Sequence, residues 1–149
     1  MDLSLKNGLS GKTVVELGAT PGGWTMVLLE AGATVTSVDW ADLTDPWLTA
    51  HEKLKHMRED ARIFDPVKSE VFTPGGRVDY VFADLAMPPA KSMEAFDEWL
   101  KNKWSTAFAW TFKLGFHTGS RYAAVTALIR ERLDAYGPDL IYTIRHLYN

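Results

Sequence analysis

Short β-branched runs alternate along this chain with stretches whose apolar residues recur at the helical period. Thr13–Leu17 is such a run, and apolar residues between Trp24 and Ala31 follow it at helical spacing. Parallel strands need a long crossover, usually a helix, so this alternation predicts an α/β fold with a parallel sheet and helices on both faces. The predicted strands are residues 13–17, 34–38, 55–59, 78–83, 106–112 and 140–147.

Two more helices are predicted in the second half of the chain. Pro88–Pro89 should block an immediate helix, so that Ser92 caps one with an apolar face formed by Phe96, Trp99 and Leu100. Ser120 is expected to cap the last helix, which Gly137–Pro138 ends. Residues 62–77 contain two prolines and two glycines and are expected to form an irregular connection.

Composition limits the classes of protein that the chain can belong to. Its 149 residues are 46% hydrophobic and 23% charged, which predicts one soluble domain over residues 1–149. The absence of cysteine excludes disulfide frameworks and thiol nucleophiles. No apolar run approaches the roughly 20 residues that span a bilayer, so a cytoplasmic protein without membrane contact is expected. No metal site is expected, because His51 and His56 are five residues apart and cannot share a helix face.

The residues just beyond successive strand ends carry the chemistry of the chain. In parallel α/β sheets, ligands bind outside the carboxyl ends of the strands, where the strand order reverses. This sequence places there a glycine-rich turn over residues 18–24, three aspartates and one lysine, namely Asp39, Asp60, Asp84 and Lys113. We therefore expect a ligand site at this edge of the sheet.

The glycine-rich turn is compatible with more than one reading. The simplest interpretation is a tight turn that binds no ligand. However, Asp39 ends the next strand, and a carboxylate at that position can accept hydrogen bonds from a ribose diol. Nicotinamide dinucleotide sites also have a carboxylate that binds the ribose, so such a site is an alternative interpretation. The spacing G-x-x-x-G-G, with Pro21 inside it, disfavours this alternative because dinucleotide sites have G-x-G-x-x-G.

Several segments together resemble a known family. Glu16–Thr25, reading ELGATPGGWT, is similar to the first motif of FtsJ-like S-adenosylmethionine-dependent ribose 2′-O-methyltransferases. The resemblance is closest to the RlmM branch, which methylates a cytidine 2′-hydroxyl in large-subunit ribosomal RNA. It implies a Rossmann-like class I methyltransferase domain whose partners are S-adenosylmethionine and RNA. The other matching segments are residues 37–40, 58–61, 83–91, 111–114 and 146–148.

The resemblance also implies a role for each residue at the strand ends. Asp39 would hold the ribose hydroxyls of the cofactor, and Asp60 would accept a hydrogen bond from its adenine amino group. Asp84 would lie beside the sulfonium and help orient the target hydroxyl, and Lys113 would be the catalytic amine. Lys113 would act as a base only if its surroundings favoured the neutral amine, and otherwise would orient the hydroxyl. The methionine end of the cofactor would be lined by Gly18, Gly22, Gly23 and Trp24.

The chain also departs from the family's pattern. The family has a second catalytic lysine upstream of the glycine motif, whereas Lys6 and Lys12 lack the matching context. A catalytic glutamate on a final antiparallel strand is expected to be missing, so another domain or chain would complete the sheet. A catalytically incomplete module that binds S-adenosylmethionine or RNA is therefore the alternative function. A basic rim and two loop residues are further candidates for RNA contact, namely Lys91, Lys101, Lys103, Lys113, Arg121, Phe116 and His117.

Overall fold

A five-stranded parallel sheet forms the centre of the protein in a computed structural model that describes residues 8–69, 71, 77–115 and 119–145. The strands are β1 (Thr13–Leu17), β2 (Thr34–Asp39), β3 (Leu54–Arg58), β4 (Val78–Ala83) and β5 (Ser105–Trp110). Their order in the sheet is β3-β2-β1-β4-β5. Because β1 pairs with both β2 and β4, the order reverses at β1, and a ligand site is expected there.

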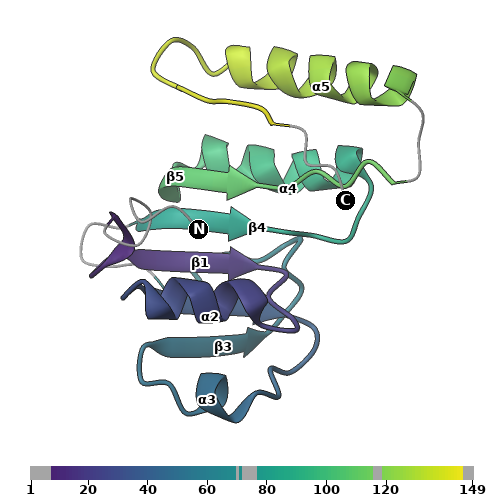
Figure 1. Ribbon diagram of the computed structural model, residues 1–149. Helices are drawn as coiled ribbons and strands as arrows, with labels where there is room; N and C mark the ends of the chain where they lie inside the picture. Colours follow the sequence, from purple (N-terminus) through teal and green to yellow (C-terminus); the bar gives the residue numbers. More distant parts are fainter. Residues whose placement is uncertain (1–7, 70, 72–76, 116–118, 146–149) are drawn as a thin grey trace.

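Helices cover the two faces of this sheet, as the alternation of the sequence predicts. α2 (Gly23–Glu30) and the single turn α3 (Pro46–Thr49) lie on one face. The other face is covered by α4 (Pro89–Lys101), and α5 (Gly119–Asp134) packs next to α4 beyond β5. Figure 1 shows α2 beside β1 and α5 as the outermost element, past α4 and β5.

Alternation of side chains along the strands divides the core between the two faces. Val14 and Val35 pack under α2, whereas Val15, Leu17 and Val38 point to the opposite face. A third cluster joins α4 to α5 through Phe96, Ile129 and Leu133, among other residues. A parallel sheet must be buried on both faces, and these clusters provide that burial at the centre of the sheet.

Two predicted boundaries are wrong by a few residues. α4 begins at Pro89, because a proline at the first helical position has a suitable φ and needs no N–H partner. Ser92 is therefore not a cap. It is buried inside α4, where its hydroxyl accepts a hydrogen bond from Trp110 Nε1 at 2.9 Å. β5 ends at Trp110 rather than residue 112, since β4 ends at Ala83 and offers no further partner beyond one hydrogen bond from Thr111 N.

The predicted last strand is also wrong for its described part, residues 140–145, which forms no strand. Burial alternates along it as in a strand, with Leu140, Tyr142 and Ile144 packed on the α4–α5 cluster and Ile141 90% exposed. Figure 1 shows this segment turning back from the end of α5 on the side that faces β5. Side-chain packing thus orders the segment, but within the described residues no neighbouring strand supplies a backbone ladder to it or to the outer edge of β5.

The described helices include none that is long and apolar enough to cross a membrane.

Candidate functional site

Two glycines let the turn after β1 pack closely against its surroundings. Gly18 has a φ of 81°, and a Cβ on it would lie 2.8 Å from the carbonyl oxygen of Asp84. Gly22 precedes α2 with a φ of 108°, and a Cβ there would lie 2.5 Å from Cδ1 of Leu48 in α3. Only glycine fits such positions without strain. The turn is therefore held between the end of β4 and α3, with the start of α2 at its far end.

Asp39 anchors this glycine-rich turn from the neighbouring strand. Its Oδ2 accepts a hydrogen bond from Thr20 N at 2.9 Å, and its Oδ1 accepts one from Ala41 N at 3.0 Å. A carboxylate has about four acceptor positions, so Asp39 retains capacity for further donors. The residue thus has a structural role in the turn besides the ribose contact that the sequence suggests.

Glu16 is a buried acid beneath the turn that the sequence reasoning did not single out. Its side chain, on the α2 face of β1, is 4% exposed, and Oε2 accepts a hydrogen bond from Thr25 Oγ1 at 2.6 Å. Burial raises the pKa of Glu16 to about 7, with a smaller contribution from the negative charge of Asp39 and against the hydrogen bonds from Thr25. The signal in the sequence was a single acid inside the otherwise apolar run of Thr13–Leu17.

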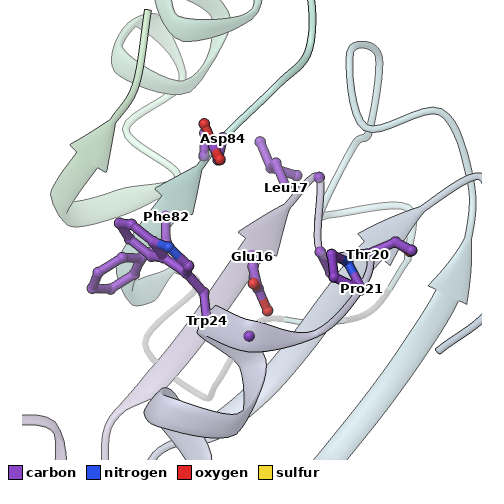
Figure 2. A pocket seen from close by; sticks show the side chains of 11 residues that line it. Glu16, Leu17, Thr20, Pro21, Trp24, Phe82 and Asp84 are labelled. Carbon is purple, nitrogen blue, oxygen red and sulfur yellow. The ribbon is translucent and has the colours of Figure 1, made fainter. Parts of the chain in front are cut away.

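The turn, β1 and β4 enclose a cavity of about 140 Å³. Four predicted residues line it, namely Gly18, Gly23, Trp24 and Asp84. Figure 2 shows Trp24 beside Phe82 on one side, Pro21 on the other and Glu16 between them. The Trp24 and Phe82 rings meet edge to face, with centroids 5.6 Å apart. Phe82 was missed because a phenylalanine inside a buried strand is an ordinary core residue by sequence.

Asp84 and Lys113 come together at the carboxyl ends of β4 and β5. Lys113 Nζ lies 2.7 Å from Asp84 Oδ1, and both side chains are partly exposed. The Oδ1 atom itself is buried and has no hydrogen-bond partner of good geometry among the described residues, so the contact is ionic rather than a directed hydrogen bond. The pair thus brings two opposite charges together beside the cavity.

Asp60 is separated from that cavity and has a different partner. Arg62 donates to both of its carboxylate oxygens, with Nε 2.8 Å from Oδ1 and 3.0 Å from Oδ2. Hydrogen bonds from Arg62 hold the pKa of Asp60 below its usual value, against the opposing effect of burial. The pair lines a second cavity of about 620 Å³ that runs along α4 past Met87 and Lys91 to Trp99.

The remaining candidates for RNA contact are less well defined. Lys91 pairs with Glu94 at 3.0 Å and Lys101 with Glu98 at 4.0 Å, both within α4. Phe116, His117 and the side chain of Arg121 lie outside the described residues. Within the described part of the chain, no three His, Asp or Glu residues gather as a metal site would require.

A parallel sheet that reverses order at β1, with a glycine-rich turn and acids at its carboxyl ends, defines a Rossmann-like α/β protein. A family profile described as FtsJ-like methyltransferase matches residues 3–127, and the chain belongs to that family.

Curated relatives agree with this placement, and one solved structure shares the fold. Ribosomal RNA large subunit methyltransferase M of Shewanella sp. (strain W3-18-1) is 33% identical over 80% of this chain and 30% of that protein. The protein of the same name from Shewanella oneidensis is 30% identical over 84% of this chain and 32% of its own length. The chain thus spans about a third of these relatives. The solved structure is that of epimerase Mth375 from Methanothermobacter thermautotrophicus, which is 16% identical. The match has a TM-score of 0.58 and covers 89% of this chain and 50% of the epimerase chain, so it shows a shared fold alone.

Proposed function

We propose that the protein binds S-adenosylmethionine at the carboxyl edge of the sheet and transfers its methyl group to a ribose 2′-oxygen of ribosomal RNA. The observation that carries the proposal is the Asp84–Lys113 ion pair, which lies beside the glycine-rich cavity. Membership of the FtsJ-like methyltransferase family and relatives named as ribosomal RNA methyltransferases support the reaction class and the substrate.

The residues around the first cavity fit this cofactor chemically. Gly18, Gly23 and Trp24 line the wall that would take its methionine end. Glu16 and Asp84 contribute acid groups to the same wall, which suits a ligand with a sulfonium and an ammonium group. Asp39 would hold the ribose hydroxyls next to the turn that it anchors.

Asp84 and Lys113 then act on the acceptor hydroxyl. The bound cofactor supplies a methyl group already activated by the sulfonium, so the protein has little covalent chemistry to perform. Lys113 Nζ can donate to the 2′-oxygen while Asp84 accepts from the hydroxyl. Holding the oxygen in line with the methyl group supplies the main rate advantage. As the oxygen–carbon bond formed, the sulfur–methyl bond would break and leave a neutral thioether, while the hydroxyl proton would pass to Asp84 and from there to water.

Radiolabelled methyl transfer onto ribosomal RNA that lacks its modifications tests this proposal. We expect transfer by the wild-type chain and none by Lys113→Ala, while calorimetry gives the two nearly the same affinity for S-adenosylmethionine. Lys12→Ala is the matched control, since Lys12 also pairs with a partly exposed aspartate, Asp79, but lies before β1 at the opposite edge of the sheet.

Three other outcomes would contradict the proposal. If Lys113→Ala lost cofactor affinity in proportion to activity, Lys113 would belong to the cofactor site instead. Binding of S-adenosylmethionine without transfer by the wild-type chain would favour a binding module, and preferential binding of NAD would contradict the cofactor assignment.

A further inference from the structure

The acceptor atoms of Asp60 are already in use. Three donor groups of Arg62 reach this carboxylate: the backbone N at 2.9 Å from Oδ1, Nε between the two oxygens, and Nη2 at 2.5 Å from Oδ2. A carboxylate offers about four acceptor positions, so most of them are filled. The Asp60 side chain is 11% exposed, whereas that of Arg62 is 57% exposed. The outward surface of this pair is therefore mainly guanidinium.

This arrangement bears directly on recognition of a purine amino group. If Asp60 accepts from the adenine amino group, as the family resemblance implies, that donor must take a position that Arg62 now fills. We infer that Arg62 is a specificity-determining residue, a latch that competes with the adenine amino group for Asp60 and lowers the affinity for adenosyl ligands. The inference rests on the proposed function, because it uses the cofactor assigned there.

Replacement of Arg62 by the ligand's amino group at Asp60 costs little free energy, so it can occur during binding. Water and salt screen an ion pair on the side of its exposed partner, and the Arg62 side chain is 57% exposed. The same cavity is lined by the carboxylates of Asp65, Glu94 and Glu98, so the surroundings of the guanidinium are acidic. The low pKa of Asp60 means that its carboxylate is charged at neutral pH and attracts whichever donor is present.

The latch should act differently on ligands with and without the amino group. A ligand that carries an amino donor gains a bond to Asp60 when it replaces Arg62. A ligand with a carbonyl oxygen at the same position cannot donate, so it gains nothing from the exchange. Removal of the guanidinium should therefore improve binding of the first kind of ligand and leave the second unchanged.

Calorimetric titration of Arg62→Ala tests the inference with two probes, S-adenosylhomocysteine and its inosyl analogue. Alanine keeps the backbone N–H bond to Asp60 Oδ1, so the local turn is preserved. We expect S-adenosylhomocysteine to bind about two- to fivefold more tightly to Arg62→Ala than to the wild-type chain, in line with the small strength of exposed ion pairs. The inosyl analogue should bind both equally.

Two controls separate a latch from a structural role. Asp60→Asn should weaken binding of S-adenosylhomocysteine, and melting curves check that each variant is folded. For the wild-type chain, rising salt should bring the affinity toward that of Arg62→Ala, because salt screens the exposed ion pair.

The remaining outcomes of the titration contradict either the competition by Arg62 or the proposed function. Weaker binding by Arg62→Ala would mean that Arg62 contacts the ligand itself, and unchanged binding would mean that it does not compete. Either result overturns the latch and leaves the proposed function standing. If neither the wild-type chain nor Arg62→Ala binds S-adenosylhomocysteine or S-adenosylmethionine, the proposed function fails and the latch falls with it.

Discussion

The two halves of the carboxyl edge are held together by different kinds of contact. At the glycine-rich turn, Asp39 accepts from backbone N–H groups, and Gly18 lies against the backbone of Asp84. Along the rest of the edge, Asp84 and Asp60 meet the long side chains of Lys113 and Arg62. Backbone groups are fixed by the fold, whereas long side chains can exchange partners at small cost. The first half is thus suited to hold a ligand in place, and the second to respond to it.

The largest loss of stability is expected at Gly18, where the turn lies against the backbone of Asp84. Gly18→Ala combines a left-handed φ with a Cβ only 2.8 Å from the carbonyl oxygen of Asp84. Strain and crowding of this kind should destabilise the fold by about 2 to 4 kcal/mol, or roughly 5 to 15 °C in melting temperature. Gly23→Ala is the matched control, because a Cβ there meets nothing within 4 Å and α2 begins at that residue. Equal losses in the two variants would contradict the close packing of the turn.

The buried acid under the turn should make stability depend on pH. The folded state holds the proton of Glu16 up to a pKa of about 7, whereas the unfolded chain releases it near 4.5. Stability should therefore fall as the pH rises between these values, by up to about 3 kcal/mol from this group. Below 4.5 both states are protonated, and Glu16 contributes no pH dependence.

Glu16→Gln tests this, since glutamine stays neutral at every pH. Relative to the wild-type chain, the variant should gain melting temperature between pH 5 and pH 8. The difference between the two chains removes the contribution of all other titrating groups. A constant difference across that range would show that Glu16 ionises normally in the fold.

A smaller change in free energy is expected when Asp39→Ala weakens binding of the cofactor. Charge-assisted hydrogen bonds contribute roughly 1.5 to 3 kcal/mol each, so Asp39→Ala should weaken binding of S-adenosylmethionine at least tenfold in calorimetry. Because Asp39 also anchors the turn, we expect a lower melting temperature as well, unlike Lys113→Ala, which removes only a partly exposed ion pair. Unchanged affinity in a folded Asp39→Ala variant would remove this residue from the ribose site.

The fold was more predictable than the contacts within the site. The first strands were predicted within one residue, because β-branched runs and glycine turns act locally. The segment after α5 shows the limit of that approach. Its alternating pattern is present in residues 140–145, but a strand also needs a neighbour with free backbone groups, which a local pattern does not specify.

The sequence by itself determined the family, the order of the five strands and of helices α2, α4 and α5, and the positions of the acids and the lysine at the strand ends. Only the tertiary structure decided which of these groups meet. It joined Asp84 to Lys113, occupied Asp60 with Arg62 and buried Glu16 under the turn. The physical reason is that charge pairing and desolvation depend on distances between segments remote in the sequence and on the rotamers of long side chains. Hydrophobic period and turn chemistry, by contrast, are properties of neighbouring residues.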